Sequence, residues 1–142
     1  MILQYPDMTS EFSMATDAST HGVGSVLFQE LIQGEGLTDK NIVSFRAHAL
    51  RSYETGYAGS PYKLELLAIV RALQDYCDYV AGRHFTVYSD HKPLTYLFSQ
   101  TRRNAHLAHW ADTLRQFHFD VVHIKGGDNI FPDLLSRTFP HL

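Results

Sequence analysis

The sequence lacks the features that would place it among membrane, secreted or multidomain proteins. It contains one cysteine, Cys77, so no disulfide can form within the chain, as expected of a reducing compartment. No stretch approaches the roughly 20 apolar residues of a membrane helix, and no cationic region followed by an apolar run indicates a signal peptide. The 142 residues suffice for one domain with a sizeable core and are too few for two ordinary ones. We therefore expect a single soluble domain over residues 1–142.

Positive charge is also in short supply. Twelve Lys and Arg stand against 15 Asp and Glu, which gives a formal net charge of −3 with the nine histidines counted as neutral. Proteins that hold nucleic acid through its phosphates are usually basic. Either nucleic acid is not the partner, or other parts of a longer protein or metal ions supply the affinity. Hydrophobic residues at 44% and charged residues at 19% meanwhile exclude a disordered chain.

Hydrophobic periodicity predicts strands first and then alternating helices and strands. Five predicted strands span residues 11–19, 22–31, 41–50, 83–90 and 119–124. Four predicted helices span residues 61–82, 93–98, 105–117 and 130–137. The first three strands are joined by short turns and indicate an antiparallel meander, whereas helices separate the later strands. This order predicts an α/β fold in which helices pack on a mixed sheet.

Two of the predicted helices carry a clear apolar face. In the helix at residues 61–82, Leu66, Ile69, Leu73 and Cys77 recur at helical spacing, so we expect them all in the core. In the helix at residues 105–117, Trp110 follows the same period. We therefore expect Trp110 to be a core residue rather than a platform on which a base stacks.

Four acidic residues occupy positions where a site can form. Two end predicted strands and two lie in predicted helices: Asp17, Asp90, Glu65 and Asp133, respectively. Ligand sites form near strand ends in such sheets. Mg²⁺ takes hard oxygen ligands, and two ions about 4 Å apart can clamp the attacking and leaving oxygens of a phosphoryl displacement. From position alone, each acid could as well be a turn residue, a helix cap or a solvated side chain.

Motifs spread along the chain identify a family. Residues 16–29, 63–73, 85–97 and 109–137 contain, in this order, TDAS, ELLAIV, SDHKPL and N-x-x-x-D-x-L-S-R. Together with the opening residues 3–19, these segments cover nearly the whole chain. The sequence resembles the RNase H domain of gypsy-type LTR-retrotransposon reverse transcriptases.

This resemblance implies an RNase H-like fold, with a five-stranded mixed sheet in strand order 3-2-1-4-5 flanked by helices. It implies endonucleolytic cleavage of the RNA strand of RNA–DNA hybrids during reverse transcription, with Mg²⁺ as cofactor and Mn²⁺ as a substitute. The family's metal-binding acids correspond to Asp17, Glu65, Asp90 and Asp133. In that scheme Asp17 bridges two ions, Glu65 and Asp90 complete the shell of one, and Asp133 completes the shell of the other.

The sequence departs from the family pattern at three positions. Gly59 and Lys63 stand where the family commonly has a tyrosine and an acid, six and two residues before the glutamate. Pro132 stands where an alanine is frequent, and proline is acceptable early in a helix. None of these changes removes a metal-binding acid.

Other residues are expected near the same site. His123 lies ten residues before Asp133. Cellular and retroviral RNase H domains have a histidine at this place that assists proton transfer or product release, whereas gypsy-type members often have tyrosine. His123 is therefore either a proton-transfer residue or an ordinary strand residue. Lys92, Arg102 and Arg103 could contact the phosphates of a hybrid or belong to a solvated loop.

The leading hypothesis is a ribonuclease H from a larger reverse transcriptase polyprotein. Its expected partners are an RNA–DNA hybrid and the polymerase portion, without a membrane, and its expected location is cytoplasmic, within retroelement particles. The alternative is a catalytically silent RNase H-like connection or scaffold domain. A silent domain would be free to lose acids, because carboxylates packed together without metal repel one another, yet all four are present. A hybrid-binding module without chemistry is disfavoured by the net charge of −3.

Overall fold

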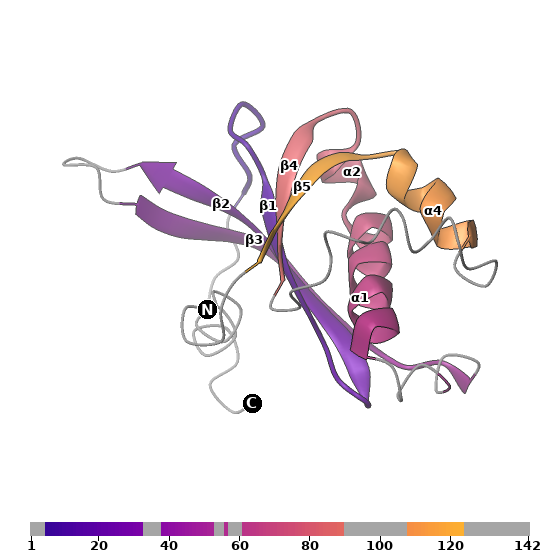
Figure 1. Ribbon diagram of the computed structural model, residues 1–142. Helices are drawn as coiled ribbons and strands as arrows, with labels where there is room; N and C mark the ends of the chain where they lie inside the picture. Colours follow the sequence, from indigo (N-terminus) through magenta and orange to yellow (C-terminus); the bar gives the residue numbers. More distant parts are fainter. Residues whose placement is uncertain (1–4, 33–37, 53–55, 57–60, 90–107, 124–142) are drawn as a thin grey trace.

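The computed structural model describes residues 5–32, 38–52, 56, 61–89 and 108–123 (Figure 1). The strands in these ranges are β1 (Ser13–Ala18), β2 (Gly22–Ile32), β3 (Thr38–Ala49), β4 (His84–Ser89) and β5 (His118–His123). The helices are α1 (Pro61–Asp75), α2 (Cys77–Val80) and α4 (Ala108–Arg115). None of the helices in the described ranges has the length and apolar character that crossing a membrane requires.

The strands form one mixed sheet in the order β3-β2-β1-β4-β5. The pairs β1–β2 and β2–β3 are antiparallel, whereas β1–β4 and β4–β5 are parallel. This arrangement confirms both the mixed sheet and the strand order that the family resemblance implied. Because β1, β4 and β5 run in the same direction, their last residues lie at one end of the sheet. We call it the carboxyl end, and the opposite end, where these strands begin, the amino end.

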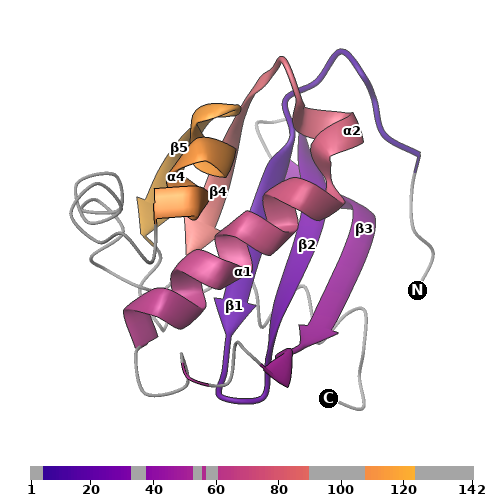
Figure 2. The same cartoon turned by 90° about the vertical axis from the view of Figure 1, so that its right-hand side faces the viewer.

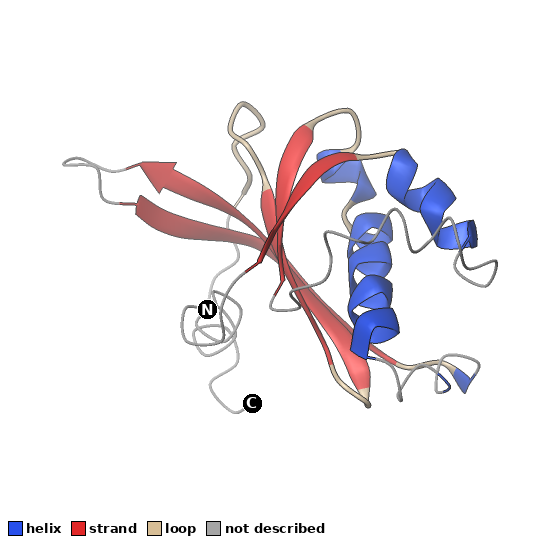
Figure 3. Ribbon diagram, in the orientation of Figure 1, coloured by secondary structure: helices blue, strands red, loops and turns tan. Residues whose placement is uncertain are grey.

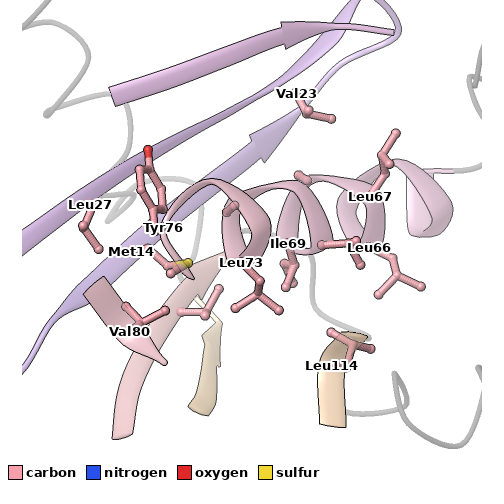
Figure 4. Close-up of a cluster of buried hydrophobic side chains, with 14 of the residues drawn as sticks. Met14, Val23, Leu27, Leu66, Leu67, Ile69, Leu73, Tyr76, Val80 and Leu114 are labelled. Carbon is pink, nitrogen blue, oxygen red and sulfur yellow. The ribbon is translucent and has the colours of Figure 1, made fainter. Parts of the chain in front are cut away.

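All three described helices cover the same face of the sheet (Figures 2 and 3). Leu66, Ile69 and Leu73 recur at helical spacing along α1 and are fully buried. They pack in one cluster with Met14 of β1 and Leu27 of β2, which are also fully buried (Figure 4). The apolar face predicted for this helix is therefore confirmed over α1.

The predicted long helix is interrupted, which corrects the position of Cys77. Trp110 of α4 is buried in the main cluster as predicted, but Cys77 is exposed. The helix breaks at Tyr76, which has φ −106° and ψ 14°. The buried Tyr76 hydroxyl accepts a hydrogen bond from Ser25 Oγ at 3.0 Å and donates to the Ser25 carbonyl oxygen at 3.1 Å. Because this anchor holds Tyr76 outside regular helical geometry, the apolar stripe of α1 does not continue to residue 77.

A tight turn joins α2 to β4. The Arg83 N–H donates to the Val80 carbonyl oxygen at 3.2 Å. Between them, Ala81 has φ −62° and ψ 133°, and Gly82 has φ +74°, which are the dihedral angles of a type II turn. An L-residue is strained at such a positive φ, so Gly82 ends this helical region as the sequence predicted.

Strands β2 and β3 extend beyond the rest of the sheet. β1 pairs with β2 only from Val23 to Phe28, whereas the pairing of β2 with β3 continues to Ile32 and Thr38. The outer part is therefore a two-stranded ribbon that projects from the sheet (Figure 1). β3 accordingly starts earlier than the predicted residue 41. The helices predicted at residues 93–98 and 130–137 lie outside the described residues.

A second, smaller apolar cluster lies on the other face of the sheet. Ala15, Val26, Phe28 and Ile42 form it, and all four are buried. Side chains alternate between the two faces along a strand. Since Met14 packs against α1 and Ala15 belongs to the second cluster, the odd-numbered residues of β1 face away from α1.

Candidate active site

Asp17 lies near the carboxyl end of the central strand. It is half-buried, two positions after Ala15, and therefore lies on the sheet face away from α1. Its register partner in β2 is Gly24, which leaves room beside the carboxylate because it has no side chain. Asp17 Oδ1 accepts a hydrogen bond from the Ala18 N–H at 3.0 Å. The structure thus confirms that Asp17 stands at a strand end.

Glu65 reaches the same end of the sheet from the helical face. It lies in the first turns of α1 and is only 8% exposed, an unusual burial for a carboxylate. The Ser89 hydroxyl donates to Glu65 Oε2 at 3.5 Å. Ser89 is the last residue of β4, is 2% exposed, and is followed in the chain by Asp90. The long helix therefore carries its glutamate to the end of β4.

His123 also lies at the carboxyl end of the sheet. It ends β5 and is exposed, and its register partner in β4 is Ser89. Paired residues of neighbouring strands project on the same face. His123 therefore lies on the α1 side of the sheet, in the strand next to the serine that contacts Glu65. Its ring remains accessible to solvent and to a bound molecule.

Several predicted site residues lie outside the described residues, so the structure does not test them: Asp90, Asp133, Lys92, Arg102 and Arg103. Within the described ranges, no three His, Cys, Asp or Glu side chains are grouped closely enough to hold a metal ion. The described part of the chain thus supplies Glu65 on one face and Asp17 on the other.

A buried hydroxyl lies next to Asp17 in the chain. Thr16 immediately precedes Asp17, is 2% exposed and has no hydrogen-bond partner for Oγ1 among the described residues. A buried hydroxyl without a partner costs about 1–3 kcal/mol. Together with the carboxylates of Asp17 and Glu65, this hydroxyl makes the donor set at the carboxyl end one of oxygen atoms. Hard divalent cations such as Mg²⁺ prefer this type of ligand.

A depression of about 490 Å³ opens beside Asp17. The end of β1, the turn that follows it, the start of β2 and the end of β3 line it, and Asp17, Ser19, His21 and His48 are among the lining residues. His48 Nε2 lies 2.6 Å from Asp75 Oδ2, at the end of α1. Sequence patterns did not single out His21, His48 or Ser89. Their place depends on the β2–β3 register and on the path of α1 across the sheet, which local spacing does not encode.

The turn beside this depression requires a glycine. A Cβ atom on Gly22 would lie 2.5 Å from the carbonyl oxygen of His48. No side-chain movement can relieve that contact, because the nearest atoms, of His48 and Ala49, are all backbone. Gly22 therefore allows the start of β2 to approach the end of β3 closely, and so fixes one wall of the depression.

Comparison with known proteins identifies the family. Residues 7–117 match the RNase H-like domain found in reverse transcriptase. The chain belongs to this family. The match includes Asp17, Glu65 and Asp90, and it ends before His123 and Asp133.

Curated relatives of this RNase H-like domain are retroelement polyproteins. The chain is 39% identical over 137 residues to the retrovirus-related Pol polyprotein from transposon 412 of Drosophila melanogaster, covering 96% of this chain and 10% of the relative. It is 35% identical over 138 residues to the Pol polyprotein from transposon gypsy of the same organism, covering 96% and 12%. The domain thus spans about a tenth of the length of these relatives.

Solved structures share the fold of the domain. The foamy viral protease-reverse transcriptase in complex with an RNA/DNA hybrid matches with a TM-score of 0.67 and 16% identity, over 87% of this chain and 16% of that chain. LC11-RNase H1, isolated from compost, matches with a TM-score of 0.53 and 18% identity, over 89% and 92%. These identities are low, so the likeness confirms the RNase H-like fold and no more.

Proposed function

We propose that this domain is a ribonuclease H that cleaves the RNA strand of RNA–DNA hybrids as part of a reverse transcriptase polyprotein. The observation that carries the proposal is the position of Glu65. A carboxylate that is 8% exposed lies beside the last residue of β4, in a domain of the reverse transcriptase RNase H-like family. Carboxylate oxygens at the end of a sheet are ligands that a hard divalent cation prefers. A divalent cation bound there would add to the hydrogen bond that Glu65 accepts from Ser89.

The residues fit a magnesium site in their chemistry. Asp17 and Glu65 would hold the metal with their carboxylate oxygens, and we assign Asp90 and Asp133 to the same site from the family motifs. Bound Mg²⁺ supplies charge stabilisation at the scissile phosphate and lowers the pKa of a water molecule. Asp17 approaches from the sheet face away from α1 and Glu65 from the opposite face. The scissile phosphate would therefore be held at the carboxyl end of the sheet, between its two faces.

His123 is the residue we assign to proton transfer. Its exposed ring in the strand beside Ser89 can contact a bound hybrid without displacing any core residue. A histidine side chain can accept or donate a proton near pH 7. It would protonate the 3′-oxygen of the leaving strand or assist release of the product.

The depression beside Asp17 is the space we assign to the RNA strand. It opens beside Asp17, so a strand lying in it would pass this carboxylate. Lys92, Arg102 and Arg103 are the cations we assign to phosphates of the hybrid. A net charge of −3 provides little general attraction, so we assign most of the affinity to the polymerase portion of the polyprotein, acting within cytoplasmic retroelement particles.

Cleavage of a labelled RNA–DNA hybrid in Mg²⁺ and in EDTA tests the proposal. We expect cleavage only with metal, and only of the RNA strand. Asp17→Asn, Glu65→Gln and Asp90→Asn should each lower the rate by several orders of magnitude, because each removes a ligand charge that stabilises the transition state. Asp112→Asn is the matched control, since Asp112 is exposed on α4 and its side chain is 77% accessible.

Stability measurements separate loss of the site from loss of the fold. Mg²⁺ should raise the denaturation midpoint of the wild-type protein and of Asp112→Asn, and should do so much less for Glu65→Gln. Wild-type cleavage by Asp17→Asn or Asp90→Asn would refute the assignment of these acids. A folded wild-type protein that binds hybrid and never cleaves it would instead identify the silent scaffold domain.

A further inference from the structure

Residues 5–10, which we call the N-terminal strap, are fastened to β2 by one buried side chain. Gln29 is 0% exposed. Its Oε1 accepts from the Asp7 N–H at 2.8 Å, and its Nε2 donates to the carbonyl oxygens of Asp7 at 2.7 Å and of Ser10 at 3.2 Å. A buried polar side chain of the sheet thus has three hydrogen bonds to the backbone of the strap.

The strap also has its own internal structure. The Asp7 carboxylate accepts hydrogen bonds from the Thr9 N–H at 3.0 Å, the Thr9 hydroxyl at 2.6 Å and the Ser10 hydroxyl at 2.9 Å. These bonds lower the pKa of Asp7, with the Thr9 hydroxyl as the largest cause. The Ser10 N–H donates in addition to the Asp7 carbonyl oxygen at 3.1 Å. The strap is therefore a formed turn rather than a loose tail.

Two further elements fasten the strap from other sides. Arg83, in the turn before β4, donates through Nη1 to the Met8 carbonyl oxygen, and its guanidinium lies 5.8 Å from the centre of the Phe12 ring. Asn41 of β3 donates through Nδ2 to the Tyr5 carbonyl oxygen at 3.5 Å. Terminal segments are usually poorly ordered unless they are tied down. This one is tied to β2, to β3 and to the start of β4.

The fastened strap exposes apolar side chains. Tyr5 is 97% exposed and Met8 is 46% exposed, and they are two of the three large hydrophobic residues that are exposed within the described ranges. The third, Val122, lies in β5. An ordered backbone that presents an aromatic ring and a methionine to solvent has the composition of an interface core. Burying both side chains against a partner would stabilise a fixed arrangement.

We propose that the strap is the rigid junction to the polymerase portion of the same polyprotein, which covers Tyr5 and Met8 while Gln29 fixes its direction. This inference rests on the proposed function. The occupant is the partner that the proposed function already requires, and the two transposon polyproteins above extend far beyond this chain, which spans only 10% and 12% of them. The strap lies at the amino end of the sheet, because it is attached to Gln29, just beyond the Ser13–Phe28 pair, and to Arg83, just before β4. A partner there leaves Asp17 and Glu65 open to substrate.

The test uses a polyprotein fragment in which the polymerase portion leads into this chain. Cys77 is exposed and is the only cysteine of the chain, so one spin label can be attached there and a second one to the polymerase portion. We expect a narrow distance distribution in the wild-type fragment. Gln29→Ala should broaden it about twofold or more, because the junction would then behave as a flexible linker. Gln74→Ala, an exposed glutamine on α1, is the matched control and should leave the distribution narrow.

A second measurement covers the case in which Gln29→Ala does not fold. Tyr5→Ser and Met8→Ser change exposed side chains and should not impair folding. Each should weaken binding of the chain to a separately produced polymerase portion by about tenfold. Unchanged binding in both variants, or an equally broad wild-type distribution, would overturn the proposal. Self-association of the chain that is detected by ultracentrifugation and is lost in Tyr5→Ser would also overturn it.

These readouts do not depend on cleavage. A narrow distribution that broadens in Gln29→Ala supports the junction even when the fragment fails to cut a hybrid. In that result only the proposed nuclease function would fail. If the fragment cleaves a hybrid but its distance distribution is broad, the nuclease function stands and the junction proposal fails.

Discussion

Removing the hydroxyl of Tyr76 should destabilise the protein by about 1–3 kcal/mol, the usual cost of leaving a buried polar partner unsatisfied. Tyr76 is 1% exposed and Ser25 is 4% exposed, so water cannot replace the two hydrogen bonds that join them. The same burial, as the first cause, raises the pKa of Tyr76 to about 12. In Tyr76→Phe the ring still fills its place in the core, and the change isolates the hydroxyl. This contact anchors the end of α1 to β2.

Urea denaturation measures the effect. With a slope of about 1–3 kcal/mol per molar for a small domain, the midpoint should fall by about 1 M. Tyr79→Phe is the control, because Tyr79 is half-buried against Phe12, with ring centres 5.9 Å apart, and its hydroxyl has no hydrogen bond among the described residues. It should change the midpoint little. Equal midpoints for Tyr76→Phe and wild type, or additive effects of Tyr76→Phe and Ser25→Ala, would refute the reasoning.

Three further predictions concern pH, catalysis and binding. The pKa of His84 is raised by the hydrogen bonds that its ring donates, first to Glu11 and then to Asp120. The stabilisation that they give the folded protein is therefore complete below the ordinary histidine pKa of about 6.5 and is lost as pH rises through the raised pKa. In His84→Gln, the free energy of unfolding should depend less on pH between these two values. His123→Ala should lower the rate of hybrid cleavage by about ten- to a hundredfold without changing metal affinity. The control His118→Ala, at the other end of β5, should leave the rate unchanged. Equal cleavage rates for His123→Ala and wild type would make His123 an ordinary strand residue. The isolated chain, with net charge −3, should bind hybrid weakly in Ca²⁺ with a shallow dependence on salt, and nanomolar binding with a steep dependence would contradict this.

The sequence predicted those parts of the fold that local periodicity specifies. The strand over residues 11–19 and the helical spacing of Leu66, Ile69 and Leu73 were predicted from local pattern, and β1 and the buried face of α1 confirm both. The break at Tyr76 was missed because its cause is a contact with Ser25, 51 residues away. The exposure of Cys77 follows from that break. A helical period cannot indicate where a long-range anchor will interrupt it.

The candidate site divides in the same way. Motifs identified Asp17 and Glu65, and the structure places them near the ends of β1 and β4. The roles of Ser89 and His48 were not predicted, because each depends on two elements meeting. Ser89 contacts α1 from β4, and His48 contacts Asp75 of α1 from β3. Strand register and helix placement determine these pairs, and neither is written in the local sequence pattern.

The two ends of the sheet differ in the kind of contact they offer, and this difference bears on the low positive charge. At the carboxyl end, Glu65 is buried and Asp17 is half-buried, so an added basic side chain there would compete for them with the Mg²⁺ ions that we propose they hold. At the amino end, Gln29 and Arg83 fasten the strap, and Tyr5 and Met8 offer apolar area. If the strap is the junction, a tethered polymerase portion raises the effective concentration of hybrid at the site without any basic surface on this domain. A net charge of −3 would then be compatible with the proposed nucleic-acid substrate, because attraction and chemistry would belong to different parts of one polyprotein.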